Sequence, residues 1–333
     1  MKDEFLKIIQ SSFPLEKRPF KSIAEKLNST EEEILNLYKN LKEEKIIRQT
    51  SAILETKKVG YKSTLVAFSV KDIEKAAEII NTHPGVSHNY ERNHEIFNLW
   101  FTLAVPEDSK LGIEKTVEIL AKVTNAEQYI ILPTIKMFKI GVVLDTTASS
   151  VEKENIKRRE YKDIHLTQLH KDIMYYLQKD IMPVKEPFKE IVETLNIDYD
   201  TFFEEINNLL EAGYIRRFAT ILNHRKAGFT ANAMVVWNVP DEVVNGVGEE
   251  LSQYKSVSHC YIRPRYQNWH YNLFSMIHGK SEDEVNQVIT EISKKFNIKD
   301  FKPLYSTREF KKSRIEYFSK SFNEWEENFS KNL

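Results

Sequence analysis

Apolar side chains recur along this chain first at helix spacing and then at strand spacing. Residues on one predicted helix face are Ile34, Leu37, Tyr38 and Leu41. This i, i+3, i+4, i+7 spacing predicts a helix over 30–44. Ser29 and Thr30 precede three glutamates, which is typical of a helix start, because hydroxyls accept from free backbone N–H groups and carboxylates favour the positive dipole end. Shorter helices are predicted over 2–10 and 20–27, so the chain opens with a helix-turn-helix pattern.

Six further segments follow these helices in the order β-α-β-β-α-β. They are predicted at 63–70, 72–82, 86–90, 96–105, 109–124 and 128–138. This order is typical of the ferredoxin-like split motif. At the other end of the chain, large apolar residues recur every three or four positions, namely Phe318, Phe322, Trp325 and Phe329. That stripe predicts a terminal amphipathic helix that packs against the protein.

The whole pattern occurs twice. Residues 20–54 align without a gap to residues 188–222, and 13 of the 35 positions are identical. Half one, the N-terminal copy, is therefore followed by half two, the C-terminal copy. The helices of half two are predicted at 168–178, 188–195 and 199–212, and its ferredoxin-like segments at 231–239, 241–254, 257–263, 270–278, 281–296 and 301–310. A repeat of this length is a duplicated domain and not a solenoid unit, whose period is about 20–50 residues.

The predicted fold class is α+β, a tandem duplication of a winged helix-turn-helix with a ferredoxin-like (βαββαβ) domain. The predicted boundaries are 1–60 and 61–145 for the two modules of half one, 146–166 for a polar linker, 167–228 and 229–315 for the modules of half two, and 316–333 for the terminal helix. Homologous halves of this kind can pack as an internal pseudo-dimer, and a homodimer of the chain is a further possibility.

Composition narrows the class. The chain has 333 residues, 41% hydrophobic and 29% charged, with a net charge of −1. No apolar run approaches the roughly 18 residues of a membrane span, and the charged N-terminal stretch does not resemble a signal peptide. The single cysteine, Cys260, excludes an intramolecular disulfide and multi-cysteine metal sites. We expect a cytoplasmic protein without a membrane partner.

A helix-turn-helix followed by a ferredoxin-like domain resembles the Lrp/AsnC family of transcription regulators. The segments 46–60 and 215–228 are similar to the segment that joins the two modules in that family. However, the would-be recognition helices, 29–44 and 197–213, have net charges of −3 and −5 by their Asp, Glu and Lys content. Helices that enter the major groove need basic residues near the phosphates. We therefore expect no nucleic-acid partner, and a DNA-binding regulator remains only an alternative function.

Polar and aromatic residues concentrate between the second and third strands of each ferredoxin-like module. Strand alternation places His88, Tyr90 and Arg92 on one face of half one. The matching residues of half two are His259, Tyr261 and Arg263. Further candidates nearby are His94, Arg265, Tyr266, Trp269 and His270. These residue types suit a flat polyanionic ligand, because arginine binds carboxylates, aromatic rings stack, and histidine transfers protons or ligates metals. P-loop, GxGxxG, GxSxG and HExxH motifs are absent from the sequence.

Four strings carry a more specific resemblance. They are VSHNYERNHEIFNLWFTL, VSHCYIRPRYQNWHYNLFSMIHG, LPTIKMFKIGVVLD and REFKKSRIEYF. The first two strings span the second and third predicted strands of the two modules, and each follows a helix-turn-helix in the sequence. Together the four strings resemble the two subunits of the siroheme decarboxylase family, here joined in tandem. The resemblance implies a carboxy-lyase that removes CO2 from the C12 and C18 acetates of siroheme. The product would be 12,18-didecarboxysiroheme, in the alternative heme or heme d1 route. The family often has another residue at the position of His270.

The chemistry implied by this resemblance sets the expected roles. The macrocycle can accept the electrons of the broken bond, so no cofactor beyond the iron tetrapyrrole substrate is expected. Candidate carboxylate anchors are Arg92, Arg263, Arg265, Arg216 and Arg217, and candidate stacking residues are Tyr90, Tyr261, Tyr266 and Trp269. Candidate acids are His259, His88, His94 and His270, although His259 or His270 could instead ligate the substrate iron. Half two, with the longer hairpin, is expected to supply most of the cleft. A heme-sensing module without catalysis is the other alternative.

Overall fold

The chain forms two compact units, each built from both halves of the sequence. The computed structural model describes residues 1–140, 151–153, 161–223 and 230–329. Unit 1 comprises Met1–Val59, Arg158–Ala227 and Glu316–Ser319, and unit 2 comprises Gly60–Lys157, Gly228–Ile315 and Lys320–Leu333. Most of the linker predicted over 146–166 lies outside the described residues.

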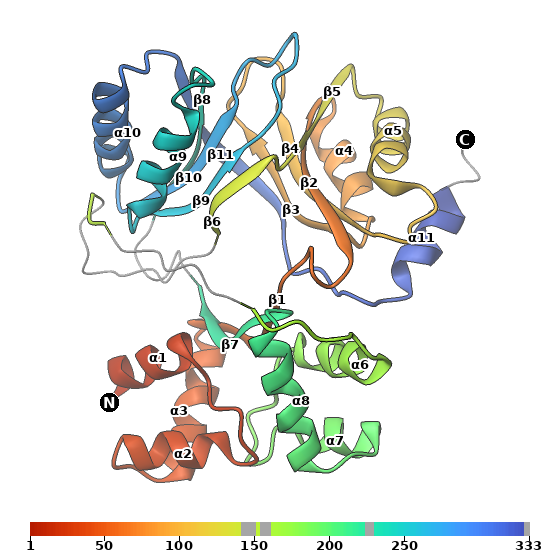
Figure 1. Ribbon diagram of the computed structural model, residues 1–333, viewed down its shortest axis with the longest axis vertical. Helices are drawn as coiled ribbons and strands as arrows, with labels where there is room; N and C mark the ends of the chain where they lie inside the picture. The colour runs from red at the N-terminus through yellow and green to blue at the C-terminus, as the bar shows by residue number, and fades with distance from the viewer. Residues whose placement is uncertain (141–150, 154–160, 224–229, 330–333) are drawn as a thin grey trace. The chain divides into compact units, whose positions relative to one another are not determined.

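Unit 1 contains the helical modules of the two halves (Figure 1). Its helices are α1 (Lys2–Ser11), α2 (Pro19–Lys26), α3 (Glu31–Glu43), α6 (Gln168–Leu177), α7 (Lys189–Leu195) and α8 (Tyr199–Glu211). All six predicted helices are confirmed. Thr30 and Glu33 form a capping box at the start of α3, as the Ser-Thr-Glu pattern predicted.

Two strands of unit 1 were not predicted. They are β1 (Ile47–Leu54) and β7 (Ile215–Leu222), which pair antiparallel and so join the halves. The ring of Phe218 on β7 contacts Phe13 of half one at 5.9 Å and Phe188 of half two at 5.7 Å between ring centroids. Buried and exposed positions do not alternate along either strand, so the sequence carries no clear period of two there.

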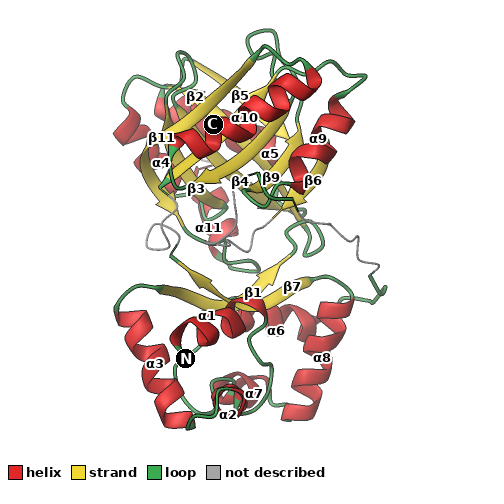
Figure 2. Ribbon diagram, turned by 90° about the vertical axis from the view of Figure 1, so that its left-hand side faces the viewer, coloured by secondary structure: helices red, strands yellow, loops and turns green. Residues whose placement is uncertain are grey.

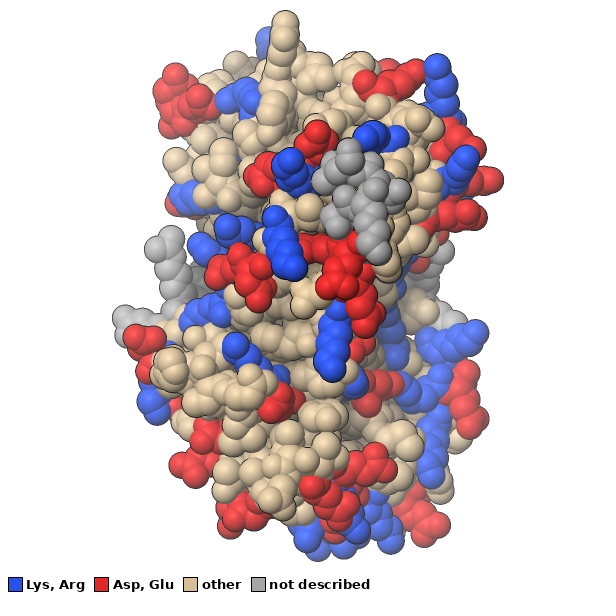
Figure 3. Space-filling model, turned by 90° about the vertical axis from the view of Figure 1, so that its right-hand side faces the viewer, with Lys and Arg blue, Asp and Glu red and all other residues tan. Residues whose placement is uncertain are grey.

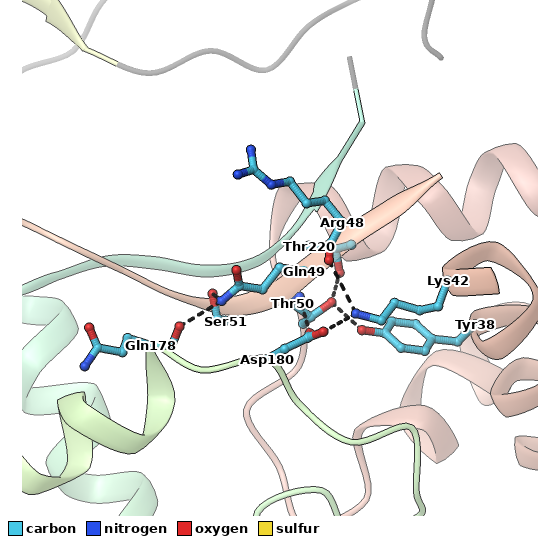
Figure 4. Close-up of polar contacts among 9 residues, drawn as sticks. All are labelled: Tyr38, Lys42, Arg48, Gln49, Thr50, Ser51, Gln178, Asp180 and Thr220. Atoms are coloured by element: carbon cyan, nitrogen blue, oxygen red, sulfur yellow. Dashed lines mark hydrogen bonds and ion pairs between the residues drawn. The ribbon is translucent and has the colours of Figure 1, made fainter. Parts of the chain in front are cut away.

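Buried hydroxyl groups cross this two-stranded sheet (Figure 4). The Oγ1 atoms of the paired residues Thr50 and Thr220 lie 2.6 Å apart, and Tyr38 donates to Thr50 Oγ1 at 2.7 Å. Asp180 accepts from the Thr50 N–H at 2.8 Å and is ion-paired with Lys42. Because all three hydroxyl groups lie in the core, each needs its partner, and the chain of bonds fixes the register of β1 against β7.

Unit 2 contains the ferredoxin-like modules, and the predicted β-α-β-β-α-β order is confirmed in half two and, up to its last strand, in half one. Half one contributes β2 (Tyr61–Ser69), α4 (Ile73–Asn81), β3 (Val86–Arg92), β4 (Leu99–Pro106), α5 (Gly112–Thr124), β5 (Gln128–Pro133) and β6 (Lys136–Ile140). Half two contributes β8 (Ala231–Trp237), α9 (Val244–Gln253), β9 (Val257–Ile262), β10 (Leu273–Gly279), α10 (Glu282–Phe296) and β11 (Phe301–Lys312). The described strands of unit 2 form one sheet in the order β5-β2-β4-β3-β11-β8-β10-β9-β6.

The halves exchange strands within this sheet. The single strand predicted over 128–138 is wrong, because the chain forms β5, which pairs with β2, and then β6, which pairs with β9 of half two. Pro133 ends β5, and proline cannot donate to a continuing ladder. Conversely, β11 pairs first with β8 and then, from Ser306 onward, with β3 of half one. Each half therefore completes the other's sheet.

Helices cover one face of each half-sheet in unit 2, with α4 and α5 on half one and α9 and α10 on half two (Figures 1 and 2). A separate apolar cluster mixes the halves and includes Trp100 and Leu132 with Phe274, Leu304 and Trp269. We call the face turned away from the helices the inner face. A terminal helix forms as predicted, but α11 (Ser321–Phe329) is shorter than the predicted 316–333, and Phe318 of the predicted stripe lies before it. Trp325 of α11 is buried in the half-one core.

Candidate functional site

Each half carries one His-Tyr-Arg stack on the inner face of its sheet. In the half-one triad, His88 and Tyr90 have ring centroids 6.1 Å apart, and the Arg92 guanidinium lies 5.2 Å from the Tyr90 ring centroid. In the half-two triad the corresponding distances are 6.0 Å for His259 and Tyr261 and 4.8 Å for Arg263 over Tyr261. The structure thus brings together the residues that strand alternation had placed on one face.

The intervening residues explain why the triads face away from the helices. Cys260 is buried among side chains of α9 and α10, and Asn89 donates to Asn81 of α4 at 2.9 Å. Since neighbouring residues of a strand point to opposite faces, His259 and Tyr261 on one strand, and Tyr90 on the other, lie on the inner face.

The two triad arginines are buried and related by the pseudo-symmetry. Arg92 is 6% exposed and donates to the Leu304 carbonyl of half two at 2.9 Å. Arg263 is 8% exposed and donates to the Leu132 carbonyl of half one. Burial lowers the pKa of each guanidinium to about 10, so both remain charged at neutral pH. The Nε atom of each has no hydrogen-bond partner within the described chain.

A buried guanidinium usually pairs with a carboxylate, because an uncompensated buried charge is costly. Over the described ranges, neither triad arginine has an ion-paired carboxylate, and each is held by backbone carbonyl or hydroxyl oxygens. Each stack therefore retains a positive charge and a buried N–H donor without a hydrogen-bond partner in the described chain. These are the features that bind a ligand carboxylate.

The exchanged strands make the two triads unequal. In half two, the cross-strand partners of Tyr261 and His259 on β6 are Met137 and Ile140. Their partners on the other side, on β10, are Phe274 and Met276. Side chains directly opposite one another in an antiparallel pair share a face. The half-two triad is therefore flanked by apolar side chains, and two of these, Met137 (48% exposed) and Ile140 (40% exposed), are open to solvent.

The half-one triad has polar neighbours on β11, whereas on β4 the cross-strand partner of Tyr90 is the apolar Trp100. On β11 the cross-strand partner of Tyr90 is Glu309 and that of His88 is Lys312, and both partners are exposed. On β4, Thr102 accepts a hydrogen bond from the His88 N–H at 3.2 Å. The equivalent faces thus differ in charge although their own His, Tyr and Arg residues are the same.

Several other predicted site residues have structural partners. Arg265 is bonded to Asp241 at 2.6 Å, to the Val239 carbonyl at 2.6 Å and to the His270 carbonyl at 2.9 Å, so most of its donors hold the hairpin in place. The His270 side chain is 56% exposed, and its Nε2 lies 3.0 Å from Asp300.

The aromatic residues of the half-two hairpin fall into two groups. Trp269 is 1% exposed and contacts Trp100 and His94, with ring centroids 5.2 Å apart in each case. A ring this deeply buried has no face left for a ligand, so the stacking role predicted for Trp269 does not fit its position. Tyr266 is 40% exposed and donates to the Ile131 carbonyl.

His94 has the environment of a structural residue. Its Nδ1 accepts from the N–H groups of Ile96 at 3.2 Å and Phe97 at 3.1 Å, which closes the half-one hairpin. Burial, and then the nearby Lys302, lower its pKa, so it is neutral at neutral pH and is a poor proton donor.

Arg216 and Arg217 belong to unit 1. Arg216 is ion-paired with Glu55. Burial, and then the charge of Arg216, lower the pKa of Arg217. An anchoring role for this pair stays a prediction. Among the described residues, no group of three or more His, Cys, Asp and Glu could hold a metal ion.

Sequence reasoning missed the strand partners Met137 and Ile140 and also the serine beside each triad histidine. Ser87 Oγ lies 2.9 Å from His88 Nδ1, and Ser258 Oγ lies 2.7 Å from His259 Nδ1. The repeated Val-Ser-His string was the available signal for the serines. No local signal pointed to Met137 or Ile140, because they reach the site through strand exchange.

The absence of a nucleic-acid partner stays a prediction from the charges of the two helices. Basic and acidic side chains are mixed over the face drawn in Figure 3. On α3, Glu31 is held by Arg18, and α8 carries acidic residues without a basic one. No helix within the described ranges is both long and apolar enough to span a membrane.

Comparisons with known proteins identify the family. A model described as an AsnC-like ligand binding domain matches residues 58–139 and 226–311, and a siroheme decarboxylase NirDL-like HTH domain matches residues 3–48. A siroheme decarboxylase of Hydrogenobacter thermophilus is 40% identical over 97% of this chain and 96% of its own length. A siroheme decarboxylase beta subunit of Methanosarcina barkeri is 43% identical over 42% of this chain and 92% of its own length.

A solved structure matches the fold over the same extent. The crystal structure of the siroheme decarboxylase NirDL in co-complex with an iron-uroporphyrin III analogue is 34% identical, covers 99% of both chains and has a TM-score of 0.78. The predicted α+β duplication and the predicted carboxy-lyase are thereby confirmed, and this chain belongs to the siroheme decarboxylase family, in the form that joins both halves in one polypeptide.

Proposed function

We propose that this enzyme removes CO2 from the acetate side chains at C12 and C18 of siroheme and forms 12,18-didecarboxysiroheme, in an alternative heme or heme d1 route. The relative with 40% identity is a siroheme decarboxylase, and a related structure was solved with an iron-uroporphyrin III analogue. An iron tetrapyrrole with carboxylate side chains is therefore the substrate class that these relatives support.

The reaction takes place at the half-two triad. The observation that carries this assignment is the apolar flank of His259 and Tyr261, formed by Met137 and Ile140 across the strand. An acetate loses CO2 more readily when its carboxylate is poorly solvated, because the charge disperses as the C–C bond breaks. The exposed carboxylate and ammonium groups opposite the half-one triad offer no such environment.

Each decarboxylation step balances without a redox partner. The bond between the acetate methylene and its carboxyl carbon breaks, CO2 leaves, and the electron pair stays on the methylene carbon, where the conjugated macrocycle delocalises it. One proton then adds to that carbon and gives a methyl group. The chain therefore has to supply a carboxylate anchor, an apolar wall and one proton, and no resident cofactor is required.

The half-two triad contains a residue suited to each task. Arg263 keeps a positive charge and an unpartnered Nε, so it anchors a spare carboxylate of the substrate. His259 donates the proton, and Tyr261 supplies a ring face between the two. His259 is the residue of this triad that could instead ligate the substrate iron.

The test is anaerobic incubation of the purified chain with siroheme under reducing conditions. We expect two equivalents of CO2 and a product lighter by that amount. Unchanged siroheme contradicts the enzyme assignment, and binding without turnover indicates a heme-sensing module. We expect His259→Ala to reduce kcat by roughly 10²-fold or more, as for loss of a general acid, with a smaller loss in His88→Ala. A shifted absorption spectrum in His259→Ala would indicate iron ligation.

Full activity in both His259→Ala and Arg263→Ala would place the site elsewhere. The half-one residues His88, Arg92 and His94 would then be the next to test.

A further inference from the structure

A chain of hydrogen bonds leads away from His259 to a second imidazole. His259 Nδ1 lies 2.7 Å from Ser258 Oγ, and the same oxygen lies 2.7 Å from His278 Nε2. The other ring nitrogen of His278, Nδ1, lies 2.5 Å from Asn232 Oδ1. Both imidazoles are partly exposed, whereas Ser258 between them is only 4% exposed.

A β-bulge positions the serine. On β9, Val257 pairs with Ile277 and His259 pairs with Met276, so Ser258 is an extra residue in the ladder. A bulge of this kind re-aims the side chains beside it. The imidazole of His278 is fixed from the opposite side, because His278 on β10 pairs directly with Asn232 on β8.

Within the residues that the structure describes, half one has the serine and the bulge but not the second imidazole. Ser87 Oγ lies 2.9 Å from His88 Nδ1, and its other contact is the Thr102 hydroxyl at 2.8 Å. Val86 pairs with Leu103 as Val257 pairs with Ile277. The residue that follows, His278 in half two, is therefore Ala104 in half one. Comparison of the equivalent positions shows that both halves have the bulge, whereas half two has a histidine where half one has Ala104.

The bonding pattern decides where the protons lie. Asn232 Oδ1 can only accept, so His278 Nδ1 carries a proton. Ser258 can accept from one imidazole while it donates to the other. A single positive charge can then reside on His259. It can also reside on His278, after one proton moves from His259 to Ser258 and the hydroxyl proton of Ser258 moves to His278. In both arrangements His259 keeps a proton on Nε2, the nitrogen that points away from the serine bond.

We infer that Ser258 and His278 form a proton relay that keeps a transferable proton on His259, and that this relay makes half two the reactive half. The inference rests on the proposed function of His259 as the acid. Each CO2 released consumes one proton from the relay, which water restores after the step. Because a substrate with two acetates requires two protonations, the acid has to be recharged between them. Ser258 and His278 act through His259 and are positioning residues.

The relay is tested by anaerobic turnover of siroheme in His278→Ala, which places the half-one residue in half two, and in Ser258→Ala, which removes one oxygen atom. We expect kcat to fall about 10-fold in each variant, below the loss expected for a direct acid, with KM unchanged. Ser258→Thr keeps the hydroxyl and should restore most of kcat. The double variant should be no slower than either single variant, because both changes break the same chain.

Two further measurements separate the relay from a purely structural effect. In mixtures of H2O and D2O, kcat of the wild type should depend non-linearly on the deuterium fraction, since more than one proton moves, and Ser258→Ala should give a straight line. The matched control is Ser87→Ala in half one, which breaks the equivalent serine–histidine bond and should leave kcat within about twofold, in line with a change outside the reacting half.

The outcomes distinguish the relay from the proposed function. If His259→Ala is inactive while His278→Ala keeps wild-type kcat, the relay is overturned and the acid role of His259 stands. The same holds if Ser258→Ala alone is slow, because the hydroxyl then only orients His259. If His259→Ala is fully active, the assignment of the acid is itself wrong. Should His278→Ala fail to fold, the measurements in H2O and D2O carry the test: a non-linear dependence in the wild type that becomes linear in Ser258→Ala supports the relay, and a linear dependence in both overturns it.

Discussion

The matched pair Arg263→Ala and Arg92→Ala separates substrate binding from stability. Each arginine is buried and donates to the carbonyl of the pseudo-equivalent leucine in the other half, Leu132 for Arg263 and Leu304 for Arg92. Either substitution leaves one buried carbonyl without this donor. That loss costs about 1–3 kcal/mol of the free energy of unfolding. We therefore expect a similar decrease in stability in the two variants.

Affinity should differ between them. A hydrogen bond from a charged donor is worth about 1.5–3 kcal/mol, which corresponds to a roughly 10- to 150-fold change in Kd. We expect this weakening for an iron tetrapyrrole with Arg263→Ala, since we propose that Arg263 anchors a substrate carboxylate beside the apolar wall of Met137 and Ile140. With Arg92→Ala, whose triad faces Glu309 and Lys312, the change in Kd should be under about threefold, less than the loss of one such bond.

The assays are anaerobic absorbance titration with the iron tetrapyrrole for Kd and denaturant unfolding for stability, both at neutral pH. The burial-lowered pKa of about 10 leaves both guanidinium groups charged under these conditions. Equal losses of affinity in the two variants would refute the asymmetry between the triads. An affinity that neither variant changes would refute the anchoring role of both arginines.

Four other predictions concern the flanking strand, the folded state and DNA. Met137→Glu should lower kcat/KM at least about fivefold, since like-charge repulsion costs about 1 kcal/mol or more, whereas Glu309→Met should have little effect on turnover. Burial, and then the charge of Lys311, lower the pKa of His83 from 6.5 to about 3. At pH values between these two pKa values, the unfolded chain binds a proton that the folded chain excludes. The free energy of unfolding should therefore fall as pH drops below 6.5, by about 2 kcal/mol at pH 5. His83→Gln should remove this contribution in unfolding titrations at pH 7 and 5. Thr50→Val leaves the buried Tyr38 and Thr220 hydroxyls without their partner (Figure 4), and denaturant unfolding should show a loss of about 1–3 kcal/mol. Gel-shift titration should detect no specific complex with promoter DNA at physiological salt, and a tight, salt-sensitive complex would overturn the argument from the acidic helices.

The sequence by itself determined the duplication, the candidate triads and the order of helices and strands in each half, except for β1, β7 and the division of 128–138 into β5 and β6. These features are local. Helix faces repeat every three or four residues, strands alternate, and a gapless repeat needs only comparison of the chain with itself. His259, Tyr261 and Arg263 could be placed on one face because alternation along a single strand requires no knowledge of its neighbours.

Only the tertiary structure decided what surrounds those residues. The pairing of β6 with β9 and of β11 with β3 brings together segments from different halves, and the periodicity of one segment carries no record of its distant partner. For this reason the apolar wall of Met137 and Ile140, the relay through Ser258 to His278, and the burial of Trp269 could not be derived from spacing. Identical triads become unequal because strand exchange and divergence of the neighbouring positions give each a different environment.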